Sequence, residues 1–192
     1  NLIHFGMGPK PGPDGKLADF QIQYVFGVTP LQQYLIELPG SKLQALSIAW
    51  DSRPQGKGGQ RWYHLYPSEE IRHDDVLHWT KLNQNWNFMC AECHSTNLQK
   101  GYVEAADSYA TTWSEIDVSC EACHGPMKAH VEWRRKYPDP KTADPTVKKL
   151  SAVQMLDTCG SCHARRGELT GSFVPGDAFT DHFTLATVDE TD

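Results

Sequence analysis

Between residues 20 and 50, hydrophobic and polar positions alternate along the chain in three short runs. Alternation with a period of two places hydrophobic side chains on one face of a β-strand, and aromatic and β-branched residues favour strands. The sequence Pro39-Gly40-Ser41-Lys42 between the second and third runs is typical of a hairpin turn. We therefore predict an antiparallel β-meander over residues 20–50. The hydrophobic positions of the three runs are Phe20, Ile22, Tyr24 and Phe26; Tyr34, Ile36 and Leu38; and Leu46, Ile48 and Trp50.

After the meander the pattern changes to loops and short helices. Residues 51–60 contain one Pro and three Gly and predict a loop. Residues 127–137 predict a helix that stops before a proline, and residues 146–166 predict a second helix that ends at a glycine. The prolines within residues 138–146 indicate a linker between these two helices.

The pattern as a whole predicts an α+β fold. Residues 1–67 form a β-rich N-terminal segment that carries the small antiparallel meander. Residues 68–192 form a segment of short helices and long loops, and we expect both segments to pack as one compact unit. Hydrophobic residues make up 39% of the chain, slightly less than is usual for a globular domain. Something other than side chains is therefore expected to fill part of the interior.

All six cysteines lie in three copies of one motif, in which two Cys separated by two residues are followed directly by His. This is the pattern of c-type haem attachment. Two intervening residues place the sulfur atoms about one helical turn apart, so they can form thioethers with the two vinyl groups of one porphyrin. The His that follows supplies the proximal iron ligand. We predict three haems c, attached at Cys90 and Cys93, Cys120 and Cys123, and Cys159 and Cys162, with His94, His124 and His163 as proximal ligands.

Zinc binding and disulfide bonding are the alternatives for these cysteines. Six Cys and nine His supply enough ligands for three four-coordinate zinc sites. Neither zinc nor a disulfide framework, however, requires a His directly after every second Cys. A thioredoxin-like redox pair requires one such motif and not three. Because bacteria attach haem c outside the cytoplasmic membrane, the haem interpretation implies an exported protein of the periplasm or the extracellular space.

Six further His are candidates for distal iron ligands. Gly125-Pro126 ends the second attachment helix, so the chain presents His130 on a new helix, from which we expect it to serve a neighbouring haem. None of the four Met is favoured as a ligand, so bis-His ligation is expected, and it leaves an iron coordinatively full. The candidates are His130, then His64, His78 and His4, then His182; His73 lies in a charged segment and is expected to be solvated.

Charge and hydropathy narrow the function classes. The net charge is −6 and no basic face is apparent, which argues against a nucleic-acid partner. No segment approaches the roughly 20 apolar residues that span a bilayer. The chain does not begin with Met and shows no signal peptide. We interpret it as a mature or partial product of an exported protein.

Several stretches are long and specific enough to support a family resemblance: residues 12–20, 26–35, 43–51, 84–97, 112–126 and 159–166. They resemble the cytochrome part of bacterial multihaem cytochromes c that carry C-terminal tetratricopeptide repeats. The Cys-His-Gly-Pro…His element is also similar to that of tetrahaem electron carriers of ammonia oxidisers, which implies that His130 ligates another haem. Such proteins have one more haem motif upstream and repeats downstream, so this chain is expected to be a fragment or a processed product.

Three functions are compatible with these features. The first is electron transfer through three haems, as a shuttle or within a larger complex or oligomer, with other redox proteins or further cytochrome subunits as partners. The alternative is a reductase of a nitrogen or sulfur oxyanion, in which one iron stays open and Arg165-Arg166 or Arg134-Arg135 holds the anion. Because all three motifs end in His, whereas such reductases often carry one Lys there, we expect an electron-transfer protein and not an enzyme. An interaction module with structural haems ranks third.

Overall fold

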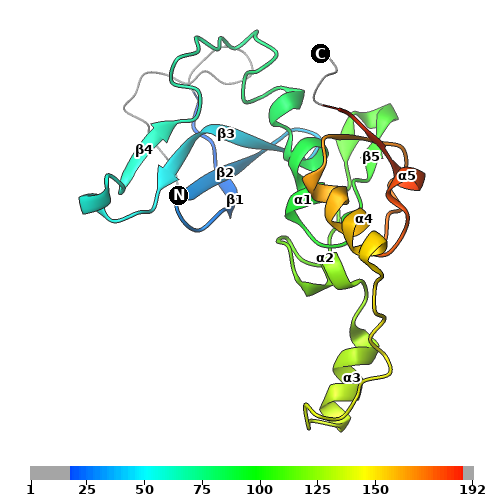
Figure 1. Ribbon diagram of the computed structural model, residues 1–192. Coiled ribbons are helices and arrows are strands. Elements are labelled where there is room, and N and C mark those ends of the chain that lie inside the picture. The colour runs from blue at the N-terminus through cyan, green and yellow to red at the C-terminus, as the bar shows by residue number, and fades with distance from the viewer. Residues whose placement is uncertain (1–17, 188–192) are drawn as a thin grey trace. The chain divides into compact units, whose positions relative to one another are not determined.

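The computed structural model describes residues 18–187 (Figure 1). The chain divides into two compact units. Among the described residues, the first unit contains residues 18–91 together with residues 100–111, and the second contains residues 92–99 and 112–187. The candidate ligand His4 lies outside the described residues. None of the helices that the structure describes is long and apolar enough to cross a membrane.

The first unit is built on a four-stranded antiparallel sheet whose strands follow one another in chain order (Figure 1). The turn between the second and third strands contains Gly40 and Ser41, both with positive φ, as a tight hairpin requires. The predicted meander is thus confirmed. The sheet continues into a fourth strand that we did not predict, in which Trp62 pairs with Trp50. The strands are β1 (Ile22–Phe26), β2 (Leu31–Leu38), β3 (Lys42–Asp51) and β4 (Arg61–His64).

The interior of the first unit is an ordinary protein core. Tyr34, Ile36 and Leu46 of the sheet are buried together with Trp79. The strands β2 and β3 are buried on both faces and not on the single face that alternation predicted. Two short helical turns, η2 (Leu82–Gln84) and η3 (Trp86–Cys90), pack against β3.

Hydrogen bonds fasten these turns and a small hairpin to the sheet. The backbone N–H of Leu43 donates to Asn87 Oδ1 at 2.7 Å, and the side chain of Asn87 donates to Thr111 Oγ1 at 2.9 Å. The hairpin consists of β5 (Tyr102–Val103) and β6 (Ser108–Tyr109), joined by the turn η4 (Glu104–Ala106). Residues 100–111 therefore belong to the first unit although they follow the first haem motif in sequence.

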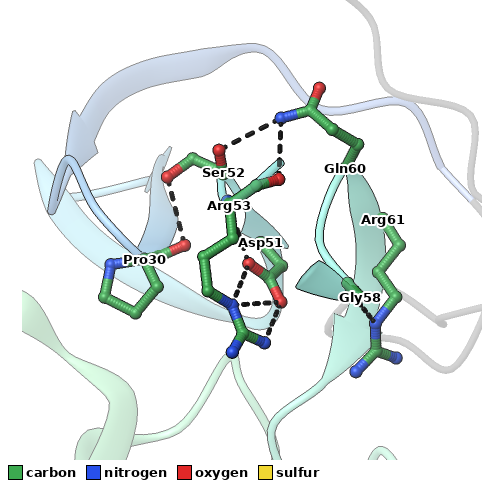
Figure 2. Close-up of polar contacts among 7 residues, drawn as sticks. All are labelled: Pro30, Asp51, Ser52, Arg53, Gly58, Gln60 and Arg61. Atoms are coloured by element: carbon green, nitrogen blue, oxygen red, sulfur yellow. Dashed lines mark hydrogen bonds and ion pairs between the residues drawn. The ribbon is translucent and has the colours of Figure 1, made fainter. Parts of the chain in front are cut away.

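The connection between β3 and β4 includes the short helical turn η1 (Gln55–Lys57). A cluster of polar side chains at the end of β3 stabilises this connection (Figure 2). The buried carboxylate of Asp51 accepts from Arg53 Nε at 2.9 Å and Nη2 at 2.6 Å. Gln60 Nε2 donates to the carbonyl groups of Ser52 and Arg53. The hydrogen bond from Arg53 lowers the pKa of Asp51 to about 2. These contacts close the loop that the sequence predicted over residues 51–60.

The second unit consists of short helices and long connections. The helix predicted over residues 127–137 is confirmed as α3 and ends before Pro138. The second predicted helix is shorter than expected. It begins after Ser151, whose side chain forms a capping box with Gln154, and its last residue is His163 because the chain then pairs as a strand. The elements are α1 (Ala91–His94), α2 (Cys120–His124), α3 (Lys128–Lys136), α4 (Ala152–His163), β7 (Arg166–Glu168), α5 (Phe179–His182) and β8 (Phe183–Leu185).

Candidate functional site

The first Cys-x-x-Cys-His motif lies where the turn η3 runs directly into α1. Asn85 caps this turn, since its side chain accepts from the N–H of Phe88 at 2.9 Å. Neither Cys90 nor Cys93 forms a disulfide, and burial raises the pKa of the Cys90 thiol. His94 is exposed at the last position of the helix. The helical turn therefore presents two thiols and one imidazole at the spacing that a c-type haem requires.

The second motif coincides with α2. Cys120, Cys123 and His124 are all exposed, and Gly125 ends the helix with a φ of 70°. The N–H of Met127 donates to the carboxylate of Glu121 at 2.7 Å. This hydrogen bond turns the chain back toward α2, and α3 starts at the next residue. His130 thus lies on a new helix, as the sequence predicted.

The third motif forms the last turn of α4. Cys159, Cys162 and His163 are exposed. Gly160 lies between the two cysteines, and a Cβ atom at this position would come within 3.2 Å of the ring of Phe179. A glycine here lets the aromatic ring pack directly against the motif. The capping box at the other end of α4 fixes where this helix begins.

Within the second unit, part of the first motif lies beside the third. Cys93 Sγ is 3.9 Å from the carbonyl oxygen of Cys162. The hydrogen bond between the two thiols lowers the pKa of Cys162 to about 6 and raises that of Cys93. Arg166 forms an ion pair with Glu92 at 2.9 Å and lies 3.9 Å from the ring centroid of Phe183. The guanidinium group thus links the two motifs.

Hydrophobic side chains near the motifs fit a large apolar cofactor. Phe88 and Met89 directly precede the first motif and are 46% and 51% exposed. Val118 precedes the second motif and is 56% exposed, and Leu156 precedes the third and is 72% exposed. Covering such side chains with a large apolar group would remove apolar surface from water, which is favourable. Together with thiols that form no disulfide and with exposed imidazoles, these side chains are compatible with a large apolar cofactor near the motifs.

The candidate distal ligands are spread over both units. In the first unit, His64 lies in β4 and its Nδ1 accepts from the N–H of Tyr66 at 3.0 Å. His78 is buried, with Nδ1 2.9 Å from Thr80 Oγ1. His182 ends α5 in the second unit, where its ring nitrogens lie near Thr170 and Asp177. Among residues 18–187, no three His, Cys, Asp or Glu side chains come together as a direct metal site.

His130 has a partner that we did not predict. Its Nδ1 lies 2.7 Å from Oδ2 of Asp144, whose side chain is 3% exposed. Burial of Asp144 opposes ionisation, but hydrogen bonds from Thr146 and His130 outweigh it and lower the pKa of the carboxyl group. Residues 138–146, which we predicted to be a linker, therefore fold back against α3. The local signal is the sequence Asp144-Pro145-Thr146, because Asp followed two residues later by a hydrogen-bond donor is typical of a turn.

Two of the arginines considered as anion ligands are occupied by protein groups. Arg134 donates to the carbonyl groups of Asp139 and Thr142 at 3.3 and 3.2 Å. Arg166 pairs with Glu92 and donates to the carbonyl group of Ser161. These contacts give both guanidinium groups a structural role.

Comparison with known proteins supports the haem interpretation. Residues 75–164 match the model of the family described as cytochrome c7 and related cytochrome c. The match covers somewhat less than half of the chain and includes all three motifs. It implies covalently bound c-type haem and haem-based electron transfer. No curated protein and no solved structure gives a significant match. The more specific resemblance to cytochromes with tetratricopeptide repeats and to carriers of ammonia oxidisers stays a prediction.

Proposed function

We propose, on the premise of the cytochrome c7 match over residues 75–164, that the chain transfers electrons through three covalently attached haems c. One observation carries the proposal. Each of the three motifs is a helical turn that presents two thiols free of disulfides and an exposed His. The cysteines form thioethers, and His94, His124 and His163 bind the irons as proximal ligands.

The distal ligands are histidines in this proposal. His130, His64, His78 and His182 of the described residues are the candidates, as is His4. An iron with two imidazole ligands has no open position, so it accepts and donates electrons without binding a substrate. Arg134 and Arg166, two of the four arginines considered for the alternative function, already contact protein groups, which supports electron transfer over an oxyanion reductase.

The adjacency of Cys93 and Cys162 supports direct electron exchange between the haems of the first and third motifs. Thioethers formed at these two positions would anchor the two haems close together. The partners are then other redox proteins or further cytochrome subunits, and the compartment is the periplasm or the extracellular space, where haem c is attached.

Low-temperature EPR combined with a spectroelectrochemical titration tests this function in the haem-loaded, exported protein. Only low-spin ferric signals, together with reversible reduction of all haems, are expected. A high-spin ferric signal that disappears on addition of nitrite, hydroxylamine or cyanide would instead favour the reductase of a nitrogen or sulfur oxyanion, because it would reveal an open iron.

A further inference from the structure

A buried carboxylate in the second unit contacts one of the candidate iron ligands. Oδ2 of Asp144 lies 2.7 Å from Nδ1 of His130. The other oxygen, Oδ1, accepts from the N–H of Thr146 at 2.8 Å and from its hydroxyl at 2.6 Å. Arg134, one turn after His130 on α3, places Nε 3.6 Å from Oδ2. The carboxylate is therefore held in one orientation by several contacts.

This contact decides which ring nitrogen of His130 is available to a metal. When Nδ1–H donates to a carboxylate, the neutral imidazole carries its lone pair on Nε2. Metal-binding histidines commonly donate their other N–H to a carboxylate, which fixes the tautomer and the ring orientation and raises the basicity of the ligand. His130 is only partly exposed, with 31% of its side chain accessible, so its ring is also confined by its surroundings.

We propose that Asp144 is a positioning residue that holds His130 as a distal ligand to one of the haem irons through Nε2. The inference rests on the proposed function, in which His130 is one of the distal ligands. The alternative role for the same contact is mechanical, since it also fastens residues 138–146 to α3. Both roles predict that Asp144 stabilises this segment, but only the positioning role predicts a change at a haem.

The test compares Asp144→Asn with Asp139→Asn in the haem-loaded protein. Asp139 is the matched control because it is an exposed acid in the same segment, and its carboxylate accepts from the N–H of Lys141. Replacing Asp144 removes the negative charge that favours ferric iron through the imidazole. One haem should therefore show a raised midpoint potential and shifted EPR g-values. The other two haems, and all three in the control, should be unchanged.

A milder variant guards against misfolding of Asp144→Asn. Thr146→Val removes the hydroxyl donor to Oδ1 and leaves the charge of Asp144 in place. With one donor fewer, the carboxylate accepts more strongly from His130. The potential of the same haem should then shift downward, opposite to the shift in Asp144→Asn. Shifts of opposite sign at one haem support the positioning role, and identical spectra in all variants overturn it.

His130→Gly separates this inference from the proposed function. One haem should become high-spin, and added imidazole should restore its low-spin signal. If His130→Gly behaves in this way while Asp144→Asn matches its control, the positioning role is wrong and electron transfer through three haems stands. If His130→Gly leaves every haem low-spin, His130 is not a ligand and the inference is overturned. The proposal that the chain transfers electrons through three haems does not depend on this result. If the exported wild-type protein carries no covalent haem, the proposed function itself is wrong.

Discussion

The two units of the chain differ in how many hydrophobic side chains they bury. In the first unit, β2 and β3 bury hydrophobic side chains on both faces, with Trp79 and Trp86 packed among them. Among the described residues of the second unit, the buried hydrophobic side chains are Phe179 and Phe183, although the unit carries the complete second and third motifs and part of the first. A fold must bury apolar surface to offset the entropy lost on ordering. We infer that covalent haems form most of the core of the second unit.

Removing one haem should have the largest effect, and it should affect the second unit more than the first. In the double variant Cys120→Ala and Cys123→Ala, no thioether can form at α2. We expect two haems per chain by the pyridine haemochrome assay and by intact mass, with lower yield of folded protein. The sheet of the first unit should keep its far-UV circular dichroism signal. An unchanged count of three haems would show that the second motif does not attach one.

Ile36→Ala tests the first unit in the same way, because it damages a core that is built from hydrophobic side chains. Ile36 is 3% exposed in the cluster with Tyr34, Leu46 and Trp79. A large-to-small change in such a core costs about 2–5 kcal/mol of unfolding free energy. Chemical denaturation should show this loss in the first unit, while the haem count and the EPR spectrum stay the same. A change at the haems would mean that the two interiors are not independent.

A pair of Val→Ala variants sharpens the comparison at the surface. Val28 in the first unit and Val153 on α4 are 78% and 66% exposed in the polypeptide. Val28→Ala should change the unfolding free energy by less than about 0.5 kcal/mol. If a haem covers Val153, its replacement should cost about 1–2 kcal/mol. Without such cover, Ala at position 153 should be neutral or slightly stabilising, because Ala favours helix more than Val does.

The smallest expected effect concerns acid stability of the first unit. The pKa of Asp51 is lowered to about 2, chiefly by the hydrogen bond from Arg53. A depressed carboxyl pKa contributes stability above the unfolded value of about 3.9, and this contribution is lost as the pH falls toward about 2. Asp51→Asn should therefore lower the melting temperature of the sheet at pH 7 and reduce its dependence on pH between 4 and 2. An equally steep acid transition in the variant would contradict the role of Asp51.

Local sequence patterns predicted the elements and motifs that depend only on residues close together in the chain. The period-two runs predicted the meander, and Pro138 predicted where α3 stops. The Cys-x-x-Cys-His motifs predicted the c-type haem that the match to the cytochrome c7 family implies. The fourth strand was missed because Arg61–His64 is only four residues long and shows no alternation. The two-sided burial of β3 was missed because the turn η3, which packs on β3, is distant in sequence: Asn87 of this turn is 44 residues from its partner Leu43.

Contacts between distant charged residues escaped the sequence analysis for the same reason. Arg166 was considered as an anion ligand, but Glu92 lies beside it in the fold. Asp144 was assigned to a linker, although its carboxylate is buried against His130. No periodicity encodes such pairs, because each depends on the path that the chain takes between the two residues.

Hydrogen exchange measured by mass spectrometry, on the haem-loaded protein and on a variant with all six Cys replaced by Ala, tests most directly whether haems form the core of the second unit. We predict that amides of β2 and β3 stay protected in both proteins. Amides of α2 and α4 should be protected only when haem is attached. Equal protection of α2 and α4 in the two proteins would show that the polypeptide alone holds this unit, and would contradict the haem core.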